Sequence, residues 1–372
     1  MNQQTSDLKD RIVSVDALRG FAMFLILATQ IGGAFIFETF SKLWGENFAS
    51  AVSPQLSWDN EKVSFINISQ SIFVFIVGVV IPFSLSKRLL LTNKKNIYIH
   101  IIKRALILFL LGLIAGGKLF DLHLVNLPVY NNVLEYISIS YLVCAILVLN
   151  TTTLMQYVWT AGFLLLGWAI FLFIPAPGWQ GDIYSSKMNI AIYIENVVLG
   201  QHGSNWIPWT GVYNTIGHIS TMLLGVLISK ILFGQRNKSD KTKLLFICSL
   251  VMFLAGWIWG HFFPVIRDHM TGSFVLETCG IATFLLASFY QIIDVWGYSK
   301  WAFFFIVFGV NSIAIYMMAH LFDFRLIGNI FVGGISSLFA SNVQNFIQAI
   351  AAMLVMWLIM YWMYLKKTFI KI

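Results

Sequence analysis

Charged residues are scarce in this chain: they make up 11% of its 372 residues, whereas 58% are hydrophobic. A soluble domain carries about 25% charged residues, so this composition could not cover a water-facing surface. It suits a protein whose solvent is lipid. The 33 Phe, 13 Trp and 13 Tyr supply the aromatic side chains that gather at membrane interfaces.

Cysteine and catalytic motifs are also scarce. Cys144, Cys248 and Cys279 fall in apolar runs without CxxC or metal-ligand spacing, so we expect small core hydrophobes and no metal. The sequence contains no P-loop, no GxSxG and no GxGxxG in a strand context. The first apolar run follows the charged residues 9–11 and has no small-residue cleavage site, which argues against a cleavable signal peptide.

Apolar runs of about 20 residues, the length that crosses a bilayer as a helix, recur along the whole chain. We place ten spans near residues 13–37, 64–86, 97–116, 129–149, 153–174, 209–233, 244–264, 273–293, 301–320 and 343–365. The shorter stretch 326–341 is interrupted by glycines. Three interpretations of it stay open: a re-entrant hairpin, an interfacial helix or an eleventh span. The sequence therefore predicts an all-α polytopic transmembrane bundle, with residues 1–372 as a single domain.

Basic residues indicate how the bundle is oriented. The net charge of +8 would suggest a nucleic-acid partner for a soluble protein, but here we take Lys and Arg as orientation signals and expect no nucleic acid. The basic clusters are Lys87, Arg88, Lys94, Lys95, Lys103 and Arg104, then Arg236, Lys238, Lys241 and Lys243, and finally Lys366, Lys367 and Lys371. If the chain has ten spans, these basic clusters and both termini lie on the same side of the membrane. Because Lys and Arg are enriched in cytoplasmic loops, we expect this side to be cytoplasmic. An eleventh span would place the C-terminal lysines on the opposite side.

The long loops fall on the opposite side, near 38–63, 175–208 and 321–342. Loop 175–208 opens with PAPGWQGD and closes with SNWIPW. Its Pro, Gly and Trp content predicts an ordered lid at the membrane surface rather than a linker.

Charge at membrane depth is the most informative feature of the sequence. An ionisable group there costs about 2.5–3.5 kcal/mol on insertion scales, so it persists where it faces the bundle interior, a partner or water. Asp16 and Arg19 lie three residues apart in the first span, on one helical face, and can pair. Two interpretations stay open: an interfacial salt bridge, or a basic mouth for an anionic cytosolic ligand, with Arg19 suited to phosphate.

Other polar residues lie in later spans. They include Asn67 in the second, Glu135 in the fourth, His218 in the sixth, Glu277 in the eighth and Asn311 in the ninth. His218 is either a satisfied core histidine or an acid–base group on an interior face. An isolated carboxylate such as Glu277 is seldom without a function inside a span. Catalysis would have to be assembled from several helices, since no local motif supplies it.

Several stretches, taken in order, resemble the heparan-α-glucosaminide N-acetyltransferase family and its bacterial relatives. They are RIVSVDALRGFAMFLIL, SIFVFIVGVVIPFSLSKR, KRALILFLLGLI, VLEYISISYL, IPAPGWQGDIYSSKMNIAIYIENVVLG, GVYNTIGHISTMLLGVL, PVIRDHMTGSFVLETCG and FGVNSIAIYMM, and they span nearly the whole chain. The resemblance implies a ten-span core with cytoplasmic ends that moves an acetyl group across the membrane. Cytosolic acetyl-CoA would be the co-substrate, and an amino sugar or glycan on the far side the acceptor. It further implies a homodimer, and we expect a bacterial inner membrane.

Some residues match this family directly. Asp16, Arg19 and Gly20 match its first-span motif, and Asn311 and Tyr316 match its later NxxxxY segment. In the segment around PxxKxxWTxSF, the matching residues are Pro264, Thr271 and Ser273, while Arg267 stands for the lysine and Met270 for the tryptophan.

The catalytic stretch departs from the family pattern. Relatives carry a His shortly before Trp-X-Gly and then Asp-Leu-X-Phe-Pro, whereas this chain reads SPQLSWDNEKVSFINISQSIF without a histidine. Gln55 or Trp58 occupies the histidine's place, Asn67 replaces the aspartate and Ser71 the proline, and Gln30 falls where relatives have an amide or an acid.

This loss has a chemical consequence. An amine acceptor is mostly an ammonium ion at neutral pH, and a base near pH 7 that removes its proton is worth about 10²–10⁴-fold. Neither Gln nor Trp can act as that base. Three outcomes stay open: another base has taken over, the mechanism relies on positioning alone, or the fold has lost acetyl transfer.

We therefore predict a membrane-embedded N- or O-acyltransferase. Its predicted catalytic residues are His218 paired with Glu277 as substitute base, with Gln30 or Asn67 as the donor to the oxyanion of the tetrahedral intermediate. Its predicted substrate-binding residues are Asp16, Arg19, Trp58, Glu135 and Asn311. The alternatives are a transporter or ligand-binding membrane protein on the same fold without covalent chemistry, and a non-catalytic cell-envelope subunit.

Overall fold

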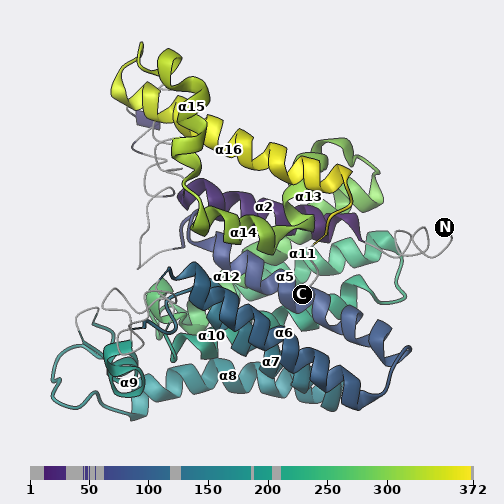
Figure 1. The fold of residues 1–372 in the computed structure, drawn as a ribbon. Helices are drawn as coiled ribbons and strands as arrows, with labels where there is room; N and C mark the ends of the chain where they lie inside the picture. The colour runs from purple at the N-terminus through teal and green to yellow at the C-terminus, as the bar shows by residue number, and fades with distance from the viewer. Residues whose placement is uncertain are drawn as a thin grey trace.

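The chain folds as a bundle of helices in the computed structural model (Figure 1). The structure describes residues 12–30, 63–117, 127–185, 188–202 and 211–369, together with residues 45, 47, 48, 50 and 55. All the regular structure in these ranges is helical. Eight of the described helices are long and apolar enough to cross a membrane, and a bent helix pair brings this to nine. The predicted all-α membrane architecture is confirmed.

The long helices follow the predicted spans. They are α2 (Val13–Gln30), α5 (Ile68–Leu89), α6 (Lys94–Ala115), α7 (Val133–Asn150), α8 (Thr153–Phe173), α10 (Asn214–Leu232), α11 (Lys238–Trp259), α12 (Gly272–Phe289) and α16 (Ser341–Leu365). The bent pair is α13 (Phe303–Val310) and α14 (Ser312–Leu321). Shorter elements are α9 (Ile190–Val198), η3 (Gly200–His202), η4 (Arg267–His269), the π-helical turn η5 (Tyr290–Val295), η6 (Lys300–Ala302) and α15 (Phe324–Ser336).

Side-chain caps explain where several helices begin. Asn93 accepts a hydrogen bond from the amide of Asn96 at the start of α6, and Thr152 accepts one from Met155 at the start of α8. Such caps satisfy backbone donors that have no partner inside the helix. The starts of these helices are therefore encoded locally, whereas their length follows from the apolar runs.

The bundle has an inner set of helices and an outer set. The inner helices α5, α10 and α12 are mostly buried, and α2 packs against α5 and α12. The outer helices α6, α8 and α11 expose large apolar side chains, among them Leu106, Trp159 and Val251. Exposed apolar faces of this extent are unfavourable in water and favourable in hydrocarbon. The architecture is that of an integral membrane protein.

Glycines bring the inner helices into backbone contact. A Cβ on Gly78 of α5 would overlap the carbonyl oxygen of Met222, and one on Gly225 of α10 would overlap the carbonyl oxygen of Phe75. Small residues at such crossings allow the close packing that stabilises helix pairs in lipid. The α5–α10 crossing is thus one of the close helix crossings of the core.

Contacts between helix ends define one end of the bundle, which we name the basic end. The carboxylate of Asp294 accepts the amides of Val13 (3.3 Å) and Ser14 (3.1 Å) at the start of α2, and its backbone carbonyl accepts Lys238 Nζ (2.7 Å). Figure 1 shows the α5–α6 and α10–α11 turns and the end of α16 at this end, so the described basic clusters gather there as expected. We name the opposite end, at the left of Figure 1, the α9 end.

The stretch 326–341 forms most of α15 and the turn after it. A helix of 13 residues is about 20 Å long, shorter than the roughly 30 Å hydrocarbon core, and α15 is not among the described helices long enough to cross a membrane. α15 packs along α16, with Gly328 against the backbone of Ala352, and this hairpin extends at the α9 end (Figure 1).

Candidate functional site

Buried polar residues gather at the α9 end, where α5, α7, α10 and α12 begin. Here η4 and the first turns of α5 and α12 enclose a hollow about the size of one water molecule. We name it the Arg267 hollow; its lining residues are Asn67, Gln70, Ser71, Arg267, Met270 and Phe274. They come from two parts of the chain that are distant in sequence, the start of α5 and the turn before α12.

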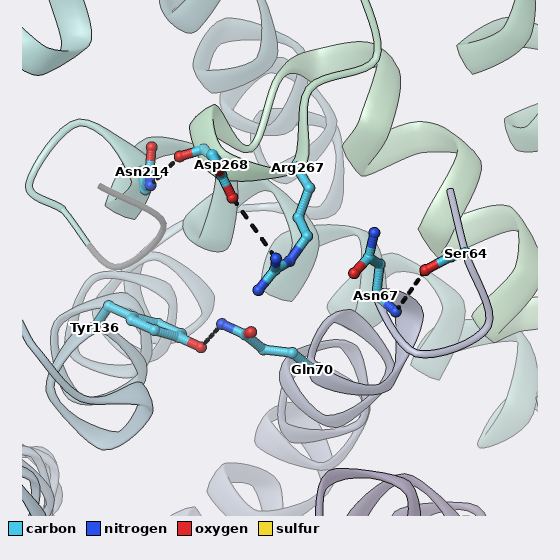
Figure 2. Close-up of polar contacts among 7 residues, drawn as sticks. All are labelled: Ser64, Asn67, Gln70, Tyr136, Asn214, Arg267 and Asp268. Atoms are coloured by element: carbon cyan, nitrogen blue, oxygen red, sulfur yellow. Dashed lines mark hydrogen bonds and ion pairs between the residues drawn. The ribbon is translucent and has the colours of Figure 1, made fainter. Parts of the chain in front are cut away.

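Arg267 projects from η4 into the bundle, towards α5 and α7 (Figure 2). Its side chain is 11% exposed, and its Nη1 lies 3.7 Å from Oδ1 of Asp268. Burial lowers the pKa of Arg267 and raises the pKa of Asp268, while each charge opposes that effect on the other. The turn is held in place by Asn214, whose Nδ2 donates to the carbonyl of Asp268 (2.6 Å).

A second set of polar groups lies beside this hollow. Gln70 Nε2 donates to the hydroxyl of Tyr136 (Figure 2), and the Tyr136 ring stacks on the ring of His218, with centroids 3.8 Å apart and planes within 5°. His218 is 0% exposed, and neither ring nitrogen has a hydrogen-bond partner in the described part of the chain. Tyr136 thus separates the histidine from Gln70 and the hollow.

Glu135 lies one residue before Tyr136 and is completely buried. Its Oε2 accepts the amide of Tyr130 (2.6 Å), while its Oε1 has no hydrogen-bond partner among the described residues. Asn132, which caps the start of α7, also accepts the hydroxyl of Tyr316 from α14 (3.1 Å). A carboxylate and a phenol from two helices therefore meet at the start of α7.

The helix α9 belongs to the predicted lid 175–208 and is anchored by two side chains. Glu195 Oε2 accepts the amide of Val212 just before α10 (2.8 Å), and burial raises the pKa of this carboxyl. Asn189 caps α9 by accepting the amide of Ile192 through Oδ1 (3.0 Å), so its Nδ2 is the atom that faces Nε2 of His269 (2.7 Å). An amide nitrogen can only donate, so His269 accepts and is neutral; burial lowers its pKa to about 4.

A separate polar cluster lies at the basic end. Arg19 donates from Nη2 to Asp16 Oδ1 (2.8 Å) and from Nε to the carbonyl of Gly309 (2.8 Å). That carbonyl belongs to the last turn of α13, where the chain bends by 64° into α14 at Asn311. Asn311 Nδ2 in turn donates to the carbonyl of Thr368 (3.0 Å). Arg19 therefore satisfies a backbone group that the helix break leaves without an intrahelical partner.

The structure brings together only some of the predicted site residues. Asp16, Arg19 and Asn311 share the cluster at the basic end. Asn67 lines the Arg267 hollow, with His218 nearby behind Tyr136.

No hydrogen bond or ion pair among the described residues joins Glu277 to either cluster. Glu277 faces Gly256 of the outer helix α11, and no hydrogen bond or ion pair in the described ranges joins it to His218. That pairing stays a prediction. Trp58 and the side chain of Gln30 lie outside the part of the chain that the structure describes.

Sequence reasoning gave no site role to Gln70, Tyr136 and Arg267. Gln70 and Tyr136 each lie in the first turn of a span, where a polar group is unremarkable in sequence. Arg267 stood out in the sequence as the residue in the place of the family's lysine, without a role of its own.

Comparison with protein-family models and with curated proteins found no match for this chain. The family resemblance described above therefore stays a prediction.

Proposed function

We propose that the protein is a membrane-embedded acyltransferase that uses acetyl-CoA from the cytoplasm to acylate an extracytoplasmic amino sugar or glycan. In this proposal the basic end is cytoplasmic and the α9 end is extracytoplasmic. Ten spans result when α2 and the α13–α14 pair are each counted as one. The protein would lie in a bacterial inner membrane as a homodimer.

The observation that carries the proposal is the position of four residues. Asn67, Ser71, Arg267 and Met270 stand where the resembling family has other residue types, and all four line the Arg267 hollow. They come from two segments far apart in the sequence, the start of α5 and the turn before α12. Their meeting at one hollow is what is expected if this hollow is the reaction site and its chemistry has changed as a unit.

The hollow offers suitable chemistry for acyl transfer. The acceptor's amine or hydroxyl would attack the thioester carbonyl carbon, and the carbon–sulfur bond would break as CoA leaves as a thiolate. Charge then develops on the carbonyl oxygen, where the donors of Arg267, Asn67 and Gln70 would stabilise it. We assign the acceptor's proton to His218, which becomes accessible when Tyr136 moves away from the hollow.

The route to the hollow requires helix movement. Three hollows between the described helices, the Arg267 hollow among them, are each about the size of one water molecule, much narrower than a pantetheine arm. At the basic end Arg19 is partly exposed beside the α13–α14 bend, and there it would meet the phosphates of CoA. Separation of α13 and α14 from α2 would then open the path.

The alternative of a transporter has one structural feature in its favour, the broken α13–α14 pair. Transporters place such breaks near mid-depth around the substrate. In this protein the break lies beside Asp16, about one turn from the basic end of α2, and therefore not at mid-depth. For this reason we prefer acyl transfer to transport.

The proposal is tested with the full chain purified into lipid nanodiscs. We expect acetyl-CoA to bind, labelled acetyl groups to appear on an amino sugar, and His218→Ala to abolish turnover while the melting temperature stays within a few degrees. His261→Ala, at an exposed histidine after α11, is the matched control and should retain activity.

Binding at the basic end is tested with Arg19→Lys, which keeps the charge and removes the planar fork. We expect weaker acetyl-CoA binding with an unchanged dependence on salt, because the charge remains and the bidentate contact to phosphate is lost. Absence of acetyl-CoA binding in both detergent and lipid would overturn the proposal. Uptake of a sugar into vesicles without CoA would instead support the transporter.

A further inference from the structure

Basic side chains gather along one side of α6, towards the basic end of the bundle. His100 lies within electrostatic reach of Arg88 at the end of α5, and of Lys103 and Arg104 on its own helix. We name these four residues the α6 cluster. In the described part of the chain, no hydrogen bond or ion pair joins the side chain of Arg88, Lys103 or Arg104 to another residue.

The sequence around the α6 cluster supplies no opposite charge. It has no acidic residue between Glu61 and Asp121, and none between Glu135 and Asp182. These stretches contain α5, α6, α8 and all of α7 after its first turn, and α7 is the helix against which α6 chiefly packs. Like charges gathered in this way repel one another, so an anion from outside these helices would stabilise them.

Arg104 is held in place by an aromatic ring rather than by an acid. Its guanidinium lies over the ring of Tyr141 of α7, 4.5 Å from the ring centroid. Its Nε is buried and has no hydrogen-bond partner among the described residues. The ring attracts the positive charge but offers no oxygen as an acceptor. The arginine is therefore oriented by α7 while its demand for an anionic partner is not met.

Apolar side chains of the outer surface lie directly beside the cluster. Ile99, Lys103 and Leu106 are spaced by four and three residues, so they share one face of α6. Ile99 is 54% exposed and Leu106 57%. A ligand on this face meets a cation between two apolar side chains. A phospholipid satisfies both, because its phosphate pairs with the cation and its acyl chains cover the apolar groups. Inorganic phosphate would satisfy the charge alone.

We propose that the α6 cluster binds the headgroup of an anionic phospholipid from the leaflet at the basic end. The phosphate pairs with cations of two helices, so the bound lipid holds the end of α5 to α6. None of these residues belongs to the proposed reaction site, and lipid binding does not depend on acyl transfer.

Native mass spectrometry of the full chain in neutral detergent tests this site, with phosphatidylglycerol, phosphatidylcholine and inorganic phosphate as probes. We expect phosphatidylglycerol to bind more tightly than phosphatidylcholine, whose choline cation neutralises its phosphate. Arg88→Gln combined with Lys103→Gln should weaken phosphatidylglycerol binding by about 25-fold, since each basic residue at an anionic lipid surface contributes about fivefold. The matched control is Lys94→Gln combined with Lys95→Gln, which removes two exposed lysines from the start of α6. It should weaken binding by less than about twofold.

Single variants keep the test decisive if the double variant fails to fold. Lys103→Gln and Arg104→Gln should each weaken phosphatidylglycerol binding by about fivefold. Thermal melts establish that each variant is folded. Added phosphatidylglycerol should raise the thermal midpoint of the wild type more than that of the double variant, because the lipid binds the folded protein.

The outcomes distinguish a built site from attraction to net charge. Equal losses in the cluster variant and in the matched control, or equal binding of the two lipids, would overturn the site. Displacement of phosphatidylglycerol by millimolar inorganic phosphate would assign the cluster to free phosphate instead. Loss of acetyl-CoA binding in the double variant, with lipid binding unchanged, would assign these cations to the nucleotide and also overturn the site. Lipid binding that depends on the cluster, in a protein that transfers no acetyl group, would retain the site and overturn the proposed function.

Discussion

Acidification should release α9 from the bundle, because His269 is held in its neutral form. Its Nε2 accepts a hydrogen bond from Asn189, the residue that caps α9, and burial lowers the pKa of His269 from 6.5 to about 4. Protonation would make Nε2 of His269 an N–H donor, and it would then face Nδ2 of Asn189, which is also a donor. The unfolded chain therefore binds this proton more readily than the folded one.

The sign and size follow from linkage. A histidine with a lowered folded pKa stabilises the fold fully above pH 6.5, and that contribution disappears as pH falls towards 4. The interval corresponds to about 3 kcal/mol, at about 1.4 kcal/mol per pH unit. The raised pKa values of Asp268 and Glu195 act in the opposite direction, because protonation on acidification favours the folded form of each.

Hydrogen exchange measured by mass spectrometry tests this prediction. After correction for intrinsic exchange rates, the amides of residues 190–198 should lose protection between pH 6.5 and 4, while those of residues 214–232 keep theirs. His269→Gln should remove most of this pH dependence, and His261→Gln, at an exposed histidine, should leave it unchanged. Constant protection of α9 over this range, or the same loss in His269→Gln, would refute the reasoning.

Three further predictions concern the helix contacts. Gly78→Ala should destabilise the protein by about 1–3 kcal/mol or more, because the added Cβ would overlap the carbonyl oxygen of Met222. We expect a lower thermal midpoint in detergent. An unchanged midpoint would contradict the close approach of α5 and α10. Arg19→Gln should cost about 1–3 kcal/mol by leaving the carbonyl of Gly309 unsatisfied, with faster exchange confined to α13 and α14 as the readout. Asp294→Ala should cost about 1 kcal/mol through loss of the cap on α2, seen as faster exchange at residues 13–18; equal rates would exclude that role.

Much of the fold could be predicted from hydropathy. The described long helices fall within a few residues of the predicted spans, because apolar runs of sufficient length have no stable alternative to helix in hydrocarbon. The break at Asn311 was missed, since the apolar run 301–320 continues through it. Its stability depends on Arg19, nearly 300 residues away in sequence, which supplies the hydrogen bond at the bend.

The candidate site was less predictable. Helical periodicity indicates which side chains share a face of one helix, but not which neighbouring helix that face meets. Glu277 illustrates this limit: it is buried, as expected of an isolated carboxylate in a span, but the sequence did not indicate that it would meet Gly256 of the outer helix α11. Arg267 shows the converse, since a residue placed in a loop by hydropathy folds back into the bundle.

The sequence by itself determined that this chain spans membranes with helices and that its basic turns share one end, because composition and charge position are local properties. Only the tertiary structure decided that Arg267, Gln70 and Tyr136 lie together beside a small buried hollow, with His218 behind the tyrosine ring. Those contacts arise where helices cross and turns fold inward, and they depend on the packing of residues far apart in the chain.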